Sequence, residues 1–406
     1  MGRAGLARLV VSGVFLALSA SFAVPTAGTF ATDLSKQDKT SVRCRIASAR
    51  KAIETEFPLR LSFVTLNGLF VRLAGQHVCN GVLKTEPHGI LFQPATGQAG
   101  TKKAAGHVQQ FASFCRQRGA AFLYVQLPRK LDICNRMLPA GVEESSHRNA
   151  RRMLESLRGA GIDCIDMCGC FAATPDDVAR NYYRTDHHWR NDAAFRMAGR
   201  LAAEIAARCA VPEADARRAS EMLSPDAWSR EVRPSCFLGS LGRRTGALFA
   251  GLDDLTVLRP RFATRMSIRI PSRNIDISGT FEETNMRRAD EATTESKSFT
   301  MDAYSALYVG GNYSHTVHTN PNAPLRVRVL LIGDSFARPV EAFLSAAVRR
   351  LDAIDPRRTS KKFNISKYVR KTKPDIVIQM INPCVFGADK MTGRKTGRAV
   401  MFEYGL

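Results

Sequence analysis

The stretch Val327–Phe336, which reads VRVLLIGDSF, combines an apolar run, a tight turn and the start of a helical pattern. An apolar run of this kind, here extending to Ile332, is typical of a strand that is covered on both faces. Helical spacing of apolar residues begins after Ser335 and continues to Leu351. We therefore expect Ser335 at the carboxyl end of a strand and the amino end of a helix, where open α/β sheets bind ligands.

A serine at this position is a candidate nucleophile. Gly333 permits a tight turn and a close approach of substrate to the backbone. The first N–H groups of the following helix are able to stabilise an oxyanion. Asp and Ser are also ordinary helix-capping residues, so the tripeptide Gly333-Asp334-Ser335 by itself equally describes a capped turn.

A second polar motif, Tyr182–Trp189, reads YYRTDHHW and supplies a candidate base. A serine nucleophile needs a base, and the base needs a group that orients it. In an extended chain, Asp186 and His188 point to similar sides, so one local segment offers both groups. Two adjacent histidines also suit a metal site, for which His315 or His318 would be a third ligand. Both interpretations remain open at this point.

Helical and strand patterns alternate along most of the chain. Helical patterns cover 102–118, 145–157, 191–209 and 336–351, and apolar strand patterns cover 122–125, 162–165, 327–332 and 375–381. This alternation predicts an α/β fold with a mostly parallel sheet. Between about 211 and 300 the periodicity is weak, apart from a strand pattern at 265–270, so we expect a loop-rich insertion there.

The amino terminus has the pattern of an export signal. Arg3 and Arg8 precede the apolar run Leu9–Val24, and small residues follow it. We predict a signal peptide at 1–27, an amino-terminal extension at 28–80 and one domain over 81–406. An uncleaved anchor is the alternative, but this run is shorter than the ~20 residues of a spanning helix.

The cysteines agree with export. All ten follow the predicted signal, so up to five disulfides are permitted. The cluster Cys164–Cys170 contains no paired CxxC motif, and we expect disulfides or buried thiols there rather than zinc.

The net charge points to an acidic partner. The chain has 59 Lys and Arg against 37 Asp and Glu, a formal charge of +22, within an ordinary globular composition. Export makes nucleic acid an improbable partner, which leaves an anionic polymer or a membrane surface. The segment Arg357–Lys373 is rich in Lys and Arg and contains no acidic residue.

The two motifs together, in this order, resemble those of the DHHW proteins and of the SGNH-hydrolase-like domain of alginate O-acetyltransferases. Supporting segments are Gly89–Phe92, Leu127–Lys130 and Tyr304–Asn312. The resemblance covers roughly residues 80 to 390 and is poorest over 211–300. It implies an SGNH-type α/β/α sandwich, circularly permuted so that the acid and the base precede the serine.

The resemblance also implies roles for individual residues. Ser335 would be the nucleophile, His188 the base and Asp186 its orienting group. The backbone N–H of Ser335, with Gly311 and Asn312, would hold the oxyanion. The implied reaction is acetyl transfer to a polysaccharide hydroxyl in the periplasm, beside a membrane-bound acyltransferase that supplies the acetyl group, with neither metal nor cofactor.

Four further residues are candidates for substrate binding. Lys130 and Arg338 are able to contact an anionic sugar, and His187 and Trp189 flank the predicted base. Two other functions use the same fold. A carbohydrate or lipid esterase would use the same three groups with water as the acceptor, and a silent glycan-binding protein would not need them.

Overall fold

The structure is a computed structural model that describes residues 60–86, 88–97, 101–131, 137–286, 307–360, 362–386, 388–389 and 399–406. The predicted signal peptide at 1–27, most of the extension at 28–80, Cys44 and Cys134 lie outside the described residues. In the part that is described, no helix is long and apolar enough to cross a membrane.

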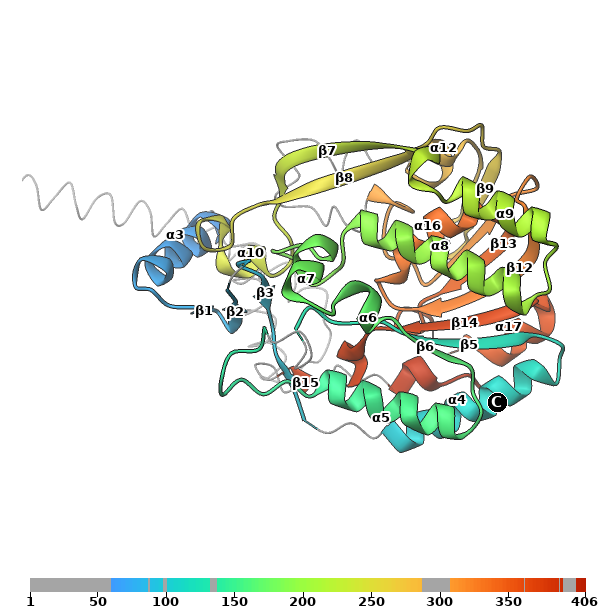
Figure 1. Ribbon diagram of the computed structural model, residues 1–406, viewed down its shortest axis with the longest axis horizontal. Coiled ribbons are helices and arrows are strands. Elements are labelled where there is room, and N and C mark those ends of the chain that lie inside the picture. Colours follow the sequence, from blue (N-terminus) through green and yellow to red (C-terminus); the bar gives the residue numbers. More distant parts are fainter. Residues whose placement is uncertain are drawn as a thin grey trace, which may run out of the picture.

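The centre of the molecule is an eight-stranded sheet with the strand order β10-β9-β11-β13-β12-β14-β5-β6 (Figure 1). Its strands are β5 (Ala121–Gln126), β6 (Cys164–Asp166), β9 (Met266–Ile270), β10 (Ile275–Gly279), β11 (His315–Thr319), β12 (Leu325–Gly333), β13 (Val348–Ile354) and β14 (Ile376–Ile381). The five strands from β13 to β6 are parallel, whereas β9, β10 and β11 join antiparallel. The predicted α/β fold with a mostly parallel sheet is confirmed.

Helices cover both faces of this sheet, as Figure 1 shows. One face carries α4 (Thr101–Arg116), α5 (Ser146–Gly159) and α17 (Ile365–Thr372), and the other carries α8 (Asn191–Arg208), α9 (Glu213–Met222) and α16 (Ala337–Ser345). The helix α4 shows the sequence reason, because its apolar residues Val108, Phe111 and Cys115 recur at helical spacing and are buried. The result is an α/β/α sandwich.

The helix predicted over 336–351 is shorter than expected. The helix α16 ends at Ser345, and the following residues form the strand β13. Apolar residues at Ala347 and Leu351 satisfy the helical period and the strand period equally well. Pairing of β13 with β11 on one side and β12 on the other settles the choice in favour of a strand.

The loop-rich character predicted for 211–300 does not hold over its described part. A long hairpin of β7 (Trp228–Phe237) and β8 (Asp253–Pro260) rises above the sandwich in Figure 1. The strands β9 and β10 extend the central sheet. η2 (Pro225–Ala227) precedes β7, η3 (Pro271–Arg273) joins β9 to β10, and α12 (Phe281–Asn285) follows β10. Only the first and last residues of β7 are buried, so its sequence lacks the apolar alternation that reveals a strand.

A small group of elements projects from one end of the sandwich. It contains α3 (Arg60–Leu73), β1 (Val78–Cys79), β2 (Val82–Lys84), β3 (Leu91–Phe92), α10 (Gly242–Thr245) and α11 (Ala247–Ala250). Its own apolar core includes Val82, Leu91 and Phe249. The remaining elements are β4 (Ala95–Thr96), α6 (Cys168–Phe171), α7 (Pro175–Asn181), η4 (Pro383–Phe386), β15 (Ala388–Asp389) and η5 (Ala399–Phe402).

Several cysteines do not form the predicted disulfides. Free thiols are present at Cys79, Cys115, Cys164, Cys170, Cys209 and Cys236. Burial raises the pKa of Cys115 to about 12, so this thiol stays protonated and unreactive. In the 164–170 cluster, for which disulfides or buried thiols were predicted, Cys164 is a half-buried free thiol and Cys170 is an exposed one.

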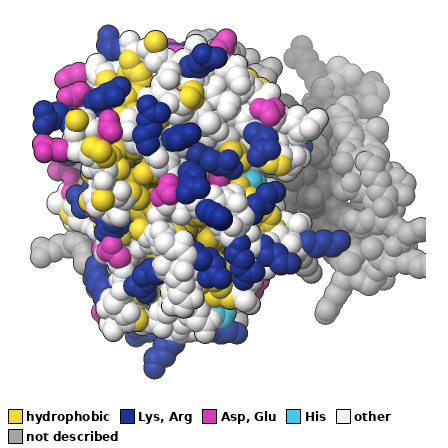
Figure 2. Space-filling model, turned by 90° about the vertical axis from the view of Figure 1, so that its right-hand side faces the viewer, with side chains coloured by type: hydrophobic (Ala, Val, Ile, Leu, Met, Phe, Trp, Pro, Cys, Tyr) yellow, Lys and Arg dark blue, Asp and Glu magenta, His cyan; other side chains and the backbone are white. Residues whose placement is uncertain are grey.

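Positive charge is not confined to one segment. Figure 2 views the molecule from the right-hand side of Figure 1, and Lys and Arg side chains are spread over that face among fewer acidic ones. The basic segment 357–373 is itself divided. Its helix α17 covers a face of the sheet, whereas Arg357 lies beside the cavity described below.

Candidate active site

The DHHW motif lies in the turn between α7 and α8, where Tyr182 and Trp189 form an isolated β-bridge. The carboxylate of Asp253 accepts hydrogen bonds from the backbone N–H groups of Arg184 and Thr185, at 2.8 and 2.7 Å. A third bond comes from the Thr185 hydroxyl at 2.6 Å. One buried carboxylate of the β7–β8 hairpin therefore fixes the backbone just ahead of Asp186.

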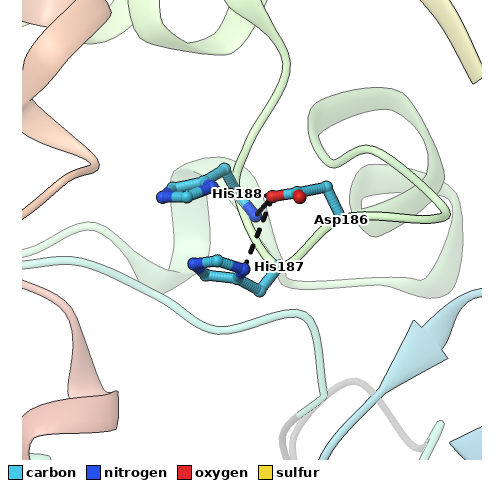
Figure 3. Close-up of side chains that lie close together, drawn as sticks. All are labelled: Asp186, His187 and His188. Atoms are coloured by element: carbon cyan, nitrogen blue, oxygen red, sulfur yellow. Dashed lines mark hydrogen bonds and ion pairs between the residues drawn. The ribbon is translucent and has the colours of Figure 1, made fainter. Parts of the chain in front are cut away.

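Asp186 is held on both of its oxygens. Its Oδ1 lies 2.7 Å from His188 Nδ1 and accepts the His188 backbone N–H at 2.9 Å, as Figure 3 shows for the side chains. Its Oδ2 accepts the Ser240 backbone N–H at 2.6 Å. Burial acts to raise the pKa of Asp186, but the two neighbouring histidines and these hydrogen bonds together hold it well below its ordinary value. Asp186 is therefore ionised and able to orient His188.

His188 connects this carboxylate to the serine. Its Nε2 lies 2.8 Å from Ser335 Oγ, within the range in which a base takes a proton. The ring of Phe336 lies 4.8 Å from the imidazole, centroid to centroid, and fixes its plane. The structure thus brings together Asp186, His188 and Ser335, the three residues that the sequence selected.

Ser335 occupies the predicted turn between β12 and α16. Asp334 fixes this turn, because its Oδ1 accepts the Phe336 backbone N–H and its Oδ2 accepts the Asn382 backbone N–H, each at 3.0 Å. Asn382 directly follows β14, so the carboxyl ends of two adjacent strands are tied together. At Gly333 an added Cβ would lie 2.9 Å from the Cβ of Ala337, which explains the glycine.

Ser335 opens into a cavity of about 370 Å³. Four basic side chains line it, namely Arg129, Lys130, Arg244 and Arg357. Arg129 and Arg357 pair with Glu144 and Asp355, at 3.0 and 2.6 Å respectively. Burial lowers the pKa of Lys130 to about 8, against the opposing effect of Asp253 and Asp186. The cavity therefore suits a substrate that carries negative charge or many hydroxyl groups.

Sequence comparison finds a similarity to a known family over part of this site. Residues 88–231 match the family model described as "SGNH hydrolase-like domain, acetyltransferase AlgX". The domain is SGNH-hydrolase-like. The resemblance predicted from the two motifs is confirmed for this segment, which contains Asp186 and His188. No curated protein matches the chain in sequence.

Solved structures share the SGNH-hydrolase-like fold over most of the chain. PatB1 of Bacillus cereus superposes with a TM-score of 0.62 at 18% identity, covering 80% of this chain and 99% of PatB1. A second PatB1 structure, with a sulfonyl adduct, gives 0.61 at 17% identity, covering 80% of this chain and 97% of that one. A DHHW family protein from Eubacterium siraeum gives 0.54 at 15% identity, covering 78% and 95%. At these identities the likeness establishes the fold.

His187 lines the cavity of the SGNH-hydrolase-like domain, and its role in substrate binding stays a prediction. Its Nδ1 lies 2.9 Å from Ser240 Oγ, and its ring lies against that of His188 with the centroids 3.8 Å apart and the planes tilted by 38°. Reduced solvation and then the charge of His188 lower the pKa of His187, so this imidazole is neutral at pH 7. His187 therefore adds a neutral polar surface beside the base.

Two predicted substrate contacts are wrong. Trp189 is fully buried and packs against Phe171 and Phe336 in the core. Arg338 is 1% exposed and pairs with Glu341 one helical turn away. Side chains next to a functional residue often point into the core. Their spacing in the sequence does not distinguish a core residue from a substrate contact.

The predicted oxyanion residues Gly311 and Asn312 do not line the cavity beside Ser335. They precede β11, whose first residue pairs with the last residue of β13. This register places them at the same edge of the sheet as Ser335. Their role in holding an oxyanion stays a prediction.

Metal binding is the alternative for the paired histidines. One ligand atom from each of Asp186, His187 and His188 lies within 4.8 Å of the others. A metal ion there would have to replace the hydrogen bond that holds His188 Nδ1 against Asp186. The other two candidates do not complete the group, since His315 lies 3.0 Å from the Tyr368 hydroxyl and His318 lies 3.6 Å from Glu341. The geometry favours a proton-transfer site.

Sequence reasoning missed Arg129, Arg244 and Asn382, and it named Arg357 only as part of the basic segment 357–373. Asn382 could have been predicted from the sequence. It comes soon after the apolar strand Ile376–Ile381, as Ser335 comes soon after β12. The carboxyl ends of adjacent parallel strands meet at one edge, so the rule that selected Ser335 also selects Asn382. The three arginines come from loops and α10, whose positions depend on tertiary packing.

Proposed function

We propose that this protein is an O-acetyltransferase that transfers acetyl groups to polysaccharide hydroxyls through an acyl-enzyme on Ser335. The observation that carries the proposal is the continuous chain of hydrogen bonds from Asp186 through His188 to Ser335 at the wall of a cavity. The match of residues 88–231 to an acetyltransferase family model supports it.

The first half of the reaction forms the acyl-enzyme. Ser335 Oγ attacks the carbonyl carbon of the acetyl donor while His188 Nε2 takes the hydroxyl proton. Negative charge collects on the former carbonyl oxygen, for which the Ser335 backbone N–H is the donor we propose, since the N–H groups of Phe336 and Ala337 already bond Asp334. The donor's leaving oxygen then departs with the proton returned by His188. Ionised Asp186 stabilises the imidazolium that exists between these two transfers.

The second half transfers the acetyl group to the acceptor. A sugar hydroxyl gives its proton to His188 Nε2 as its oxygen attacks the ester carbonyl. Ser335 leaves as the alkoxide and recovers a proton from His188. The basic residues around the cavity orient an acceptor that carries negative charge, which agrees with an anionic polysaccharide.

We place this reaction outside the cytoplasm. The apolar run Leu9–Val24 behind two arginines supports export, and the charge of +22 supports contact with an anionic polymer. A membrane-bound acyltransferase is the partner we propose as the source of acetyl groups.

A donor–acceptor assay tests the proposal. The protein is incubated with an acetyl ester, with and without oligosaccharides, and products are identified by mass spectrometry. We expect acetylated sugar from the wild type and none from Ser335→Ala. Release of acetate without sugar acetylation would instead indicate the esterase, and equal activity in both proteins would refute the site. Binding of oligosaccharide without any turnover would indicate a glycan-binding protein.

A labelling experiment tests the nucleophile separately. A sulfonyl fluoride reacts with activated serine hydroxyls, and one PatB1 structure contains a sulfonyl adduct. The adduct on this protein should map to Ser335 and be absent from His188→Ala. Labelling of other hydroxyls at the same rate would show that Ser335 is not activated.

A further inference from the structure

The projecting end of the molecule exposes large apolar side chains. Leu66, Phe70 and Leu73 are 47, 61 and 74% exposed, and their spacing places them on one face of α3. Val78 of β1 and Leu248 of α11 are 54 and 46% exposed at the same end of the molecule. We call these five residues the apolar patch. Single exposed apolar residues are ordinary, whereas a group of this kind marks a contact surface.

The apolar patch belongs to a firmly packed helix. An added Cβ at Gly68 would lie 2.1 Å from the backbone oxygen of Thr245, and one at Gly246 would lie 2.4 Å from the Thr65 Cα. The backbones of α3 and of the α10–α11 turn therefore touch directly. Arg72 Nη1 also donates to the Leu248 backbone oxygen at 3.1 Å. The inner face of α3 is used for packing, and the outer face has a fixed shape.

The charge around the apolar patch is mainly positive, although the exposed Glu86 directly follows its first segment and interacts with Lys84. No acidic residue occurs from Arg60 to Thr85 or from Gly239 to Leu252, the two segments that build this end. Arg72 is exposed beside Leu73, and Lys84 donates to the Phe249 backbone oxygen at 2.9 Å. Cations around an apolar face complement a surface that presents anionic groups above an apolar interior.

We propose that the apolar patch docks this protein on an anionic lipid surface. Phe70, Leu73 and Leu248 enter the boundary between headgroups and acyl chains, and Arg72 contacts lipid phosphates. Docking would also orient the cavity, because α10 follows Leu241 and carries Arg244, both of which line it. This property goes beyond acetyl transfer and does not depend on it.

A tryptophan reporter in the full chain tests the docking. The native Trp189 and Trp228 are 0 and 2% exposed, so an added surface tryptophan reports its own surroundings. With vesicles of phosphatidylglycerol and phosphatidylcholine, Phe70→Trp should shift its emission to shorter wavelength and be quenched by brominated lipid. The matched control is Val232→Trp on β7, where the native side chain is 40% exposed, and it should not respond.

Second substitutions in the Phe70→Trp protein identify the contacts. Adding Leu73→Asp should raise the lipid concentration at half-maximal shift by about tenfold or more, the effect of losing one large buried apolar side chain. Adding Val232→Asp should leave it unchanged. Turnover of a soluble acetyl ester is unchanged in both and serves as the check on folding.

Three results would overturn docking on anionic lipid. One is the absence of a shift, and another is an equal shift with phosphatidylcholine alone. The third is an emission maximum already at short wavelength without vesicles, which would mean that protein covers the apolar patch. Sedimentation would then show whether this cover is a second copy of the chain or its own residues.

Discussion

The edge of the sheet that carries Ser335 and the end that carries α3 depart from the ordinary distribution of side chains in opposite ways. At the sheet edge, Asp186 and Asp334 are 2 and 3% exposed, although burial of a carboxylate is costly. At the other end, large apolar side chains of α3 remain in contact with water. Neither arrangement is explained by stability. A sequence selected for stability alone would expose the carboxylates and bury the apolar side chains.

The two regions differ in the contacts that hold these side chains in place. Both buried carboxylates accept hydrogen bonds from backbone N–H groups, so their positions are fixed to within a narrow range. The exposed apolar residues of α3 are held by the packing of the opposite face of the helix and by the hydrogen bond from Arg72 to the Leu248 backbone oxygen. Proton transfer needs groups whose positions are fixed by hydrogen bonds. A surface contact needs only a helix that is packed in place.

The largest expected effects fall at the sheet edge. Ser335→Ala and His188→Ala each remove a group that reacts directly, and either should lower kcat for an acetyl ester by about 10⁵–10⁶-fold. Circular dichroism checks that the fold is retained. His187→Ala is the control within the cavity and should cost far less. Equal losses at His187 and His188 would mean that the base is wrongly assigned.

Asp186→Asn should lower kcat by about 10⁴-fold, because the amide no longer selects the tautomer that leaves Nε2 free to accept a proton. The substitution keeps the size of the side chain, so the Ser240 backbone contact changes little. The measurement is kcat with an acetyl ester. A loss below about tenfold would show that the carboxylate does not orient His188.

Gly239→Ala tests the precision of the sheet edge without touching a reacting group. The added Cβ would lie 2.3 Å from the Asp186 Cβ, and relief of that contact must move Asp186. A displacement of about 1 Å typically costs about 10²-fold in rate. Gly106→Ala, where an added Cβ meets nothing within 4 Å, is the matched control. Equal activity of the two variants would mean that the DHHW turn tolerates displacement.

The charge of Lys130 predicts a pH effect on acceptor binding. Because burial lowers its pKa to about 8, the cavity loses a positive charge as the pH rises from 7 to 9. The KM for an anionic acceptor should rise by about tenfold over that range, whereas the KM for a neutral acceptor should stay constant. Lys130→Met should remove the pH dependence. A pH dependence that persists in this variant would place its origin elsewhere.

The smallest effect on turnover is expected at α3. Gly68→Ala brings a Cβ against the Thr245 backbone and should loosen α3 without reaching the cavity. We expect earlier proteolysis within 60–73 and a kcat within about twofold of wild type. Proteolysis followed by mass spectrometry locates the cut. A large loss of kcat would show that the two regions are coupled rather than separate.

Local signals in the sequence predicted the mostly parallel α/β sheet and the three central site residues, whereas the sandwich was implied by the family resemblance. Buried parallel strands produce continuous apolar runs, and Ser335 directly follows one of them. Asp186 and His188 come from one short turn, so their relation needs no tertiary information. The strand β13 and the hairpin β7–β8 were missed because partner strands, not their own periodicity, determine them.

Surface roles were harder to predict than chemical ones. Lys130 and Arg338 are both basic residues next to a motif, yet one lines the cavity and the other is buried against Glu341. The two residues differ in the direction in which the backbone points their side chains, and the sequence does not reveal that direction. The helix α3 poses the same difficulty. Its exposed apolar residues would form part of the core if α10 and α11 packed on its other face.

The hydrogen bond between His188 and Ser335 joins residues 147 positions apart in the chain. Closing so long a loop is entropically costly and comes late in folding, after local helices and neighbouring strands have formed. During refolding, far-ultraviolet circular dichroism should therefore recover before esterase or transferase activity. A nascent chain that has not yet reached β12 holds its histidines without a hydroxyl to activate. The reactive centre consequently exists only in molecules in which the end of β12 has reached the turn that carries His188.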